Sequence, residues 1–76
     1  MPYANEHSCR VKEPQGFDEF ARKNGEGKTP DMVLGIKEGK SEVQAFRFPI
    51  DRFTEAEAKA FCDDKKGSFE PAAPVS

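Results

Sequence analysis

The amino-acid sequence predicts a small α+β protein, with one long and one short helix packed on one face of a mostly antiparallel sheet of three or four strands. Three stretches carry this prediction. Residues 7–12 alternate between apolar and polar side chains, as a half-buried strand does. Residues 32–48 contain two strand-like runs separated by turn-forming residues, which is typical of a hairpin. Residues 54–67 carry the start and stop signals of a helix.

The long helix is predicted to begin after Thr54, because Thr54 and Glu57 have the spacing of a capping box. In that motif a hydroxyl and a carboxylate each accept a hydrogen bond from a backbone N–H group near the helix start. Phe53 and Ala58 are placed to form a hydrophobic staple, and Gly67 is expected to end the helix in the left-handed conformation. Three apolar residues at helical spacing would face the sheet: Ala58, Phe61 and Cys62.

The predicted hairpin has its turn at residues 38–41, but its register is open. One register pairs Lys37 with Glu42, which gives a favourable ion pair across the strands. A three-residue loop would give a different register, and a slip of one residue turns every side chain to the other face. We prefer the Lys37–Glu42 register because of the ion pair.

Residues 15–23 predict the short helix. Phe17, Phe20 and Ala21 recur there at positions i, i+3 and i+4, the spacing of an apolar helical face. So short a helix, of about two turns, would depend on packing against the sheet because its intrinsic stability is low.

The chain divides into a flexible lead (residues 1–6), a single α+β domain (7–70) and a tail (71–76). Residues 24–30 are turn-forming throughout and predict a mobile loop. Residues 68–70 predict a last, short edge strand.

Composition limits the class of protein. A chain of 76 residues forms one small domain and buries only about 60% of the surface that its unfolded state exposes. With 36% apolar residues, 34% charged residues and a net charge of −2, it is polar but not charged enough to be disordered. Mild acidity and interspersed charges argue against a general nucleic-acid or membrane-surface protein. We see no apolar run that would span a membrane or serve as a signal peptide.

His7, Cys9 and Cys62 are the soft metal ligands of the sequence. Three ligands fall short of the four that structural zinc requires, and so short a chain indicates no cleft for a catalytic thiol–imidazole pair. The two cysteines could pair with each other, but two cysteines are a weak signal of a secreted disulfide scaffold. We therefore interpret them as buried free thiols of a cytoplasmic protein and expect no metal and no cofactor.

Two fragments, residues 27–29 (Gly-Lys-Thr) and 39–41 (Gly-Lys-Ser), match the end of a phosphate-binding loop. The full motif needs another glycine five residues before the second, a preceding strand and a following helix. Arg22 and Leu34 occupy the positions of that glycine, so we predict turns at both sites and no nucleotide hydrolysis.

The predicted interaction surface combines two aromatic and three basic residues: Phe46, Arg47, Phe48, Arg52 and Arg10. Arginine between aromatic side chains can stack on the bases of single-stranded nucleic acid. Nearby acids such as Asp51 and Glu55 are the partners that we expect for Arg47 and Arg52.

Four stretches share the pattern of a known small domain. They are His7-Ser8-Cys9-Arg10, Val43-Gln44-Ala45-Phe46-Arg47-Phe48-Pro49, the run from Asp51 to Ala58 with Phe53-Thr54 and Glu57-Ala58, and Phe69-Glu70-Pro71-Ala72. They resemble a domain found in proteins of tailed bacteriophages and bacterial prophages, over residues 7–72. The pattern is weaker in residues 26–41, and Phe61-Cys62 replaces its more usual Trp/Phe-Leu. The resemblance implies a structural or accessory role beside phage head and packaging functions, with no catalytic or binding residue to carry over.

These observations lead us to expect a non-enzymatic accessory or structural protein-interaction domain of phage or prophage origin. Its partner would be a protein, such as a phage structural or packaging component, bound at an exposed sheet edge or around Phe46 and Phe48. The alternative is a small nucleic-acid-binding module that uses Arg47, Arg52, Arg10 and the neighbouring aromatic residues. We expect a location in the cytoplasm of a bacterial host or in the virion, and no membrane association.

Overall fold

The computed structural model describes residues 3–73, which form a five-stranded antiparallel sheet and one helix. The elements follow the chain in the order β1 (Glu6–Arg10), β2 (Glu19–Lys23), β3 (Asp31–Lys37), β4 (Lys40–Pro49), α1 (Glu55–Asp64) and β5 (Ser68–Glu70). The strand order in the sheet is β2-β3-β4-β1-β5, so β2 and β5 are the edges. The predicted class, a small α+β fold with an antiparallel sheet, is confirmed, with five strands instead of three or four and one helix instead of two.

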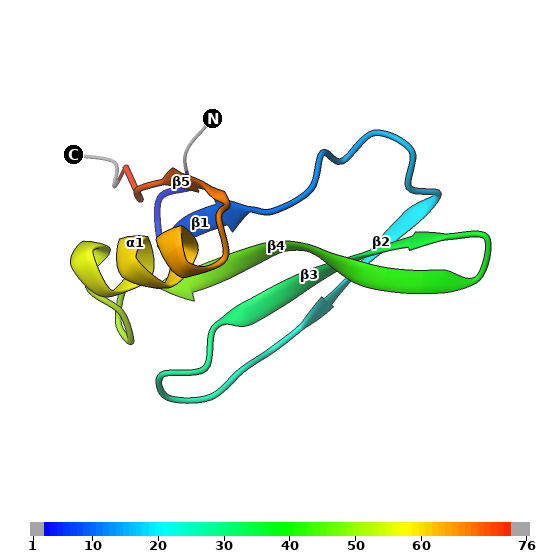
Figure 1. Ribbon diagram of the computed structural model, residues 1–76. Helices are drawn as coiled ribbons and strands as arrows, with labels where there is room; N and C mark the ends of the chain where they lie inside the picture. Colours follow the sequence, from blue (N-terminus) through cyan, green and yellow to red (C-terminus); the bar gives the residue numbers. More distant parts are fainter. Residues whose placement is uncertain (1–2, 74–76) are drawn as a thin grey trace.

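The molecule is elongated because α1 covers only one end of the sheet (Figure 1). The helix packs against β1 and β5, whereas β2, β3 and the first half of β4 extend away from it as an arm. The overall extents are 39 × 24 × 21 Å. We call the sheet face that carries α1 the helix face and the opposite face the open face.

The start of α1 is the one that the sequence predicts. The N–H of Glu57 donates to the Thr54 hydroxyl over 3.1 Å, and the N–H of Thr54 donates to the Glu57 carboxylate over 2.9 Å. The end differs by one residue, since Lys66 takes the left-handed conformation with φ 57°. The N–H of Gly67 then donates to the carbonyl of Cys62, which completes a Schellman motif.

The predicted short helix over residues 15–23 is wrong, because this segment forms a turn at Gln15–Gly16 followed by β2. Phe17 packs from the segment that leads into β2, and Phe20 packs from β2 itself. The Phe17 ring lies over Gly35 of β3, so closely that a Cβ at Gly35 would stand 2.6 Å from ring atoms. Phe20 contacts Phe17 edge to face, with 5.8 Å between ring centroids, yet stays 48% exposed.

The preferred hairpin register is also wrong. Glu38 and Gly39 form a two-residue turn with φ of 52° and 77°, as type I′ hairpins require, and Lys37 therefore faces Lys40 instead of Glu42. Because both lysines are exposed at the tip of the arm, solvent screens their repulsion.

A β-bulge at Gln44 then changes the pairing within β4. Leu34 pairs with Val43, but Val33 pairs with Ala45, so Gln44 is the extra residue. Its carbonyl accepts hydrogen bonds from the N–H groups of Val11 and Lys12. Since the bulge shifts the alternation by one residue, the odd-numbered Val43 and the even-numbered residues 46 and 48 all reach the core on the helix face.

The core lies between α1 and the end of the sheet that it covers. Phe48 is fully buried and meets Phe53 and Phe61 edge to face, at centroid distances of 5.2 and 5.4 Å. Phe46 contacts Phe61 at 5.0 Å. The predicted apolar face of α1 is confirmed, because Ala58 and Cys62 are fully buried and Phe61 is partly buried against the core. Each buried phenylalanine contributes about 2 kcal/mol.

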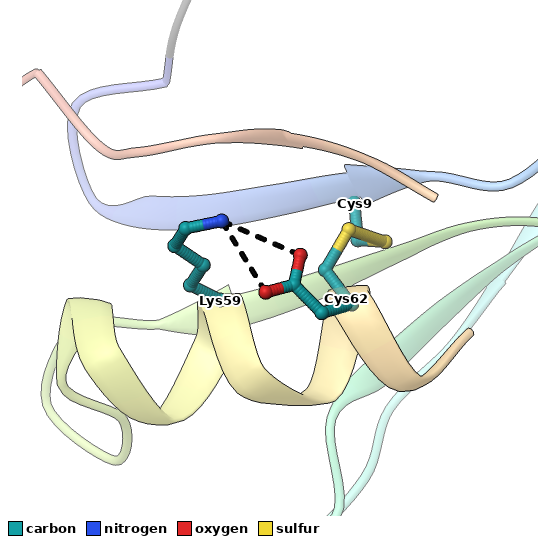
Figure 2. Close-up of a disulfide and its surroundings, with 4 residues drawn as sticks. Cys9, Lys59 and Cys62 are labelled. Carbon is teal, nitrogen blue, oxygen red and sulfur yellow. Dashed lines mark hydrogen bonds and ion pairs between the residues drawn. A yellow bond between two sulfur atoms is a disulfide. The ribbon is translucent and has the colours of Figure 1, made fainter. Parts of the chain in front are cut away.

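The two cysteines are not free thiols, as we expected, but a disulfide between β1 and α1 (Figure 2). Cys9 lies near the end of β1 on the helix face, and Cys62 lies in the last turn of α1, with 5.5 Å between their Cα atoms. Both are completely buried. Gly67 approaches the sulfur of Cys9 so closely that no side chain would fit there. Lys59, drawn beside the disulfide, pairs with Asp63 on the helix surface.

Packing extends beyond the boundaries 7 and 70 that the sequence suggests. Glu6 belongs to β1, and the N–H of Ala73 donates to the carbonyl of Tyr3 over 2.9 Å. The remaining parts of the predicted lead and tail, residues 1–2 and 74–76, lie outside the described residues. Among residues 3–73, the ten-residue α1 is too short and too polar for a transmembrane helix.

Removing the disulfide should lower the free energy of unfolding by about 2–4 kcal/mol, because it closes a loop between residues 53 positions apart. Urea unfolding of the oxidised protein and of the Cys9→Ala/Cys62→Ala variant would measure this. As a control, thiol titration of the unreduced protein in denaturant should find no reactive thiol. Two reactive thiols, or equal stability of both proteins, would contradict the disulfide.

Candidate functional site

The five residues of the predicted interaction surface do not share one surface. Phe46 and Phe48 are buried under α1, with 9% and 0% exposure, and are core residues. Arg10 and Arg47 lie on the open face, where Arg10 is exposed and Arg47 is half-buried. Arg52 lies in the corner between β4 and α1. The structure therefore separates the aromatic residues from the basic ones.

A charged cluster crosses the open face instead. It consists of Glu6 on β1, Arg22 on β2, Asp31 on β3, Arg47 on β4 and Arg52 after β4. Arg22 donates to Glu6 over 2.7 Å and to Asp31 over 2.9 Å. These two carboxylates raise the pKa of Arg22 above its usual value. The cluster thus connects four of the five strands.

Asp31 is the most buried member of the charged cluster, with 6% exposure. Burial alone would raise the pKa of its carboxyl group, but three donors outweigh that effect and the pKa lies below its usual value. The donors are the guanidinium of Arg22, the N–H of Gly25 at 2.7 Å and the guanidinium of Arg52 at 3.0 Å. Arg52 also donates to the carbonyl of Gly25. The carboxylate of Asp31 therefore fixes the start of the 24–30 loop.

The 24–30 loop also contacts the first turn of α1. The ammonium of Lys28 lies 3.0 Å from the Glu57 carboxylate and also donates to the carbonyl of Arg52. Hydrogen bonding from Thr54 and Lys28 lowers the pKa of Glu57. The Gly-Lys-Thr fragment lies in a turn, as the sequence predicts, whereas in the Gly-Lys-Ser fragment only Gly39 is in the turn and Lys40 and Ser41 begin β4.

Arg47 has partners that the sequence did not indicate. Its guanidinium donates to the hydroxyl of Tyr3 over 2.8 Å and stacks on the Tyr3 ring, 4.5 Å from the centroid. Its Nε lies 3.5 Å from the Glu6 carboxylate. The expected local partners Asp51 and Glu55 do not hold Arg47 or Arg52. Chain segments distant in sequence supply the partners instead.

A shallow hollow of about 350 Å³ adjoins the charged cluster on the open face. Its lining includes Tyr3, Arg10 and Arg47, together with Ser8 and Ser68. Among residues 3–73, Arg10 makes only a long ion pair with Glu13, at 4.0 Å, so its charge is the most accessible one there. The hollow brings two of the three predicted arginines together.

The soft ligands are engaged within the fold. Cys9 and Cys62 bond to each other, and Nδ1 of the buried His7 accepts a hydrogen bond of 2.8 Å from the N–H of Ala72. As an acceptor, Nδ1 carries no proton. No cluster of potential metal ligands occurs among residues 3–73.

The edge strand β2 is the other exposed feature. All five of its residues are exposed, and within the described part of the chain it pairs only with β3. An edge strand presents unpaired backbone N–H and C=O groups along its outer side. Phe20 stands on it as a large exposed apolar side chain.

Sequence reasoning missed Tyr3, Glu6, Arg22 and Asp31. The signal that could have found Glu6 and Asp31 is their position at the first residue of a strand, where an acid can reach across the sheet. The exposed β2 edge was hidden by the incorrect helix assignment. Comparisons with protein-family models, with curated proteins and with solved structures found no match.

Replacing Asp31 by Asn should cost about 2 kcal/mol at pH 7, because within residues 3–73 it leaves Arg52 without a charged partner and Arg22 with Glu6 alone. A carboxyl group whose pKa is lower in the folded state stabilises the fold above its unfolded pKa, near 4, and this stabilisation is lost as the pH falls. The variant should therefore lose less stability than the wild type between about pH 5 and pH 2.

Urea unfolding at neutral and acidic pH would measure both effects. Asp51→Asn is the matched control, since Asp51 is exposed and makes no ion pair within residues 3–73. Equal stability losses in the two variants would show that the charged cluster contributes nothing specific.

Proposed function

We propose that the chain is a non-enzymatic protein-interaction module of phage or prophage origin, which binds an extended segment of its partner along the free edge of β2. The observation that carries the proposal is that all five residues of this strand are exposed at the sheet's edge. A partner strand added there gains backbone hydrogen bonds at low cost, since the edge is already in the extended conformation.

The side chains around this edge favour a partner with both apolar and charged groups. Phe20 and the partly buried Phe17 form an aromatic pair on the open face. Arg22 and Lys23 add positive charge at one end of β2, and Glu19 adds negative charge at the other. Alternate side chains of a strand point to opposite faces of the sheet. The side chains of such an edge can therefore distinguish partner sequences, while its backbone groups provide affinity.

The groups that could perform chemistry support an interaction role because they are already engaged in folding. The imidazole of His7 accepts from the backbone, the cysteines form a disulfide, and Asp31 accepts from three donors. Each would have to give up a buried contact before it could act on a substrate.

The phage or prophage origin rests on the sequence resemblance of residues 7–72. The disulfide bears on the location, because disulfides persist in oxidising surroundings and on virion surfaces and are rare in a reducing cytoplasm. Of the two expected locations, we therefore propose that the protein acts in the virion, with a phage structural component as its partner.

A photo-crosslinking amino acid placed at position 20 on β2 should capture the partner in virions or in phage-producing cells. The same amino acid at Lys59, exposed on α1, is the matched control. Mass spectrometry would identify the products. We expect one dominant protein adduct from position 20 and none of it from position 59.

Two substitutions of Ala21 should separate strand addition from incidental contact with the partner. Ala21→Pro and Ala21→Thr alter the same residue of β2, but only proline removes a backbone donor and disturbs strand pairing. Loss of the adduct with proline and its retention with threonine would support strand addition. Equal capture from positions 20 and 59 would refute it.

The hollow on the open face favours a second candidate, a nucleic-acid-binding module. Arg10, Arg47 and the Tyr3 ring lie together there and could contact a phosphate and a base. Titration with single-stranded and duplex DNA at two salt concentrations tests it. Affinity that falls steeply with salt and with Arg10→Ala would support this candidate, and absence of binding at low salt would exclude it.

A further inference from the structure

β2 carries two charged side chains without an ion-pair partner. Within residues 3–73, neither Glu19 nor Lys23 makes an ion pair, whereas Arg22 between them makes two. Alternation places Glu19, Ala21 and Lys23 on the helix face of β2. The strand Glu19-Phe20-Ala21-Arg22-Lys23 therefore has opposite charges at its two ends and a small residue at its centre.

We propose that the partner of β2 is a second copy of this chain, whose β2 pairs antiparallel with the first about a two-fold axis at Ala21. This inference rests on the proposed use of β2 for strand addition, and it names the occupant. The two sheets would join into one continuous antiparallel sheet of ten strands, since each copy contributes five.

The pairing is self-complementary in charge. With Ala21 opposite Ala21 of the second copy, Glu19 faces the second copy's Lys23, and Lys23 faces its Glu19. Opposite charges directly across an antiparallel pair stabilise it. The small Ala21 side chains on the axis let the two backbones approach. Both unpaired charges of the strand thus gain a partner, twice by symmetry.

The open face of the same pair is complementary as well. Phe20 faces the second copy's Arg22. The guanidinium of Arg22 is already held in place by Glu6 and Asp31, through Nη1 at 3.2 Å and Nη2 at 2.7 and 2.9 Å. The flat face of a guanidinium can stack on an aromatic ring while its N–H groups donate hydrogen bonds. The exposed Phe20 would cover that face.

Other arrangements of two β2 strands are less favourable. A parallel pair would set Glu19 against Glu19, Arg22 against Arg22 and Lys23 against Lys23, which places like charges opposite one another. An antiparallel pair shifted by two residues sets either Phe20 against Phe20 or Arg22 against Arg22, and leaves Glu19 without Lys23. Only the register centred on Ala21 pairs every charged residue of the strand favourably.

Sedimentation velocity across about 10 µM to about 1 mM should show a reversible change from monomer to dimer, since the interface is small and its affinity modest. Glu19→Lys and Lys23→Glu should each weaken the dimer by about tenfold or more, because each sets like charges opposite one another. Glu26→Lys and Lys40→Glu make the same charge changes at exposed positions outside β2 and should leave the dimer unchanged.

The decisive experiment mixes the two weakened variants. A Glu19→Lys chain carries two lysines at these positions, and a Lys23→Glu chain carries two glutamates, so their equimolar mixture should dimerise although each alone does not. The double variant Glu19→Lys/Lys23→Glu should regain self-association. Circular dichroism of each variant checks that the fold is retained.

A wild type that stays monomeric over the whole range would overturn the inference, as would a dimer that both single variants leave intact. The proposed function has a separate readout. If position 20 still captures a different protein while the chain remains monomeric, strand addition stands and only the identity of the partner is wrong. If position 20 captures no protein and the chain stays monomeric, the proposed function and this inference both fail.

Discussion

The disulfide between Cys9 and Cys62 is the constraint on which the fold depends most, because it fixes α1 onto β1 at the covered end of the sheet. A chain of this length has a small core, and here that core occupies only one end of the molecule. The disulfide lies inside it, in one buried cluster with Phe46, Phe48 and Ala58. The absence of a side chain at Gly67 allows the chain after α1 to pass beside the Cys9 sulfur and return as β5. With this end fixed, the arm of β2, β3 and the first half of β4 extends without a covering helix.

Much of the covered end could be predicted from the sequence. The capping box and the apolar face of α1 are local signals, and both appear in the structure as expected. The strands around residues 7–12, 32–48 and 68–70 also follow from short-range alternation and turn residues. These features depend on residues that lie close to each other in the sequence, and sequence patterns describe that range well.

The arm could not be predicted as well, for physical reasons. The spacing of Phe17, Phe20 and Ala21 fits a helix, but Phe17 precedes the strand and reaches Gly35 from a loop, so the apparent period joins two different environments. The hairpin register depends on the positive φ values of Glu38 and Gly39 and on the bulge at Gln44, which no pairwise charge argument contains. The charged cluster depends on tertiary structure entirely, because its members come from four strands and the corner after β4.

The two ends therefore have different roles: the disulfide-fixed end supplies stability, and the arm presents an edge. Native-state hydrogen exchange of the oxidised protein at low concentration tests this division most directly. We predict the slowest exchange for amides in β1, in the second half of β4 and in α1, with outward-facing amides of β2 exchanging orders of magnitude faster. Protection of β2 equal to that of β1 in dilute solution, or exchange of α1 before the arm, would contradict it.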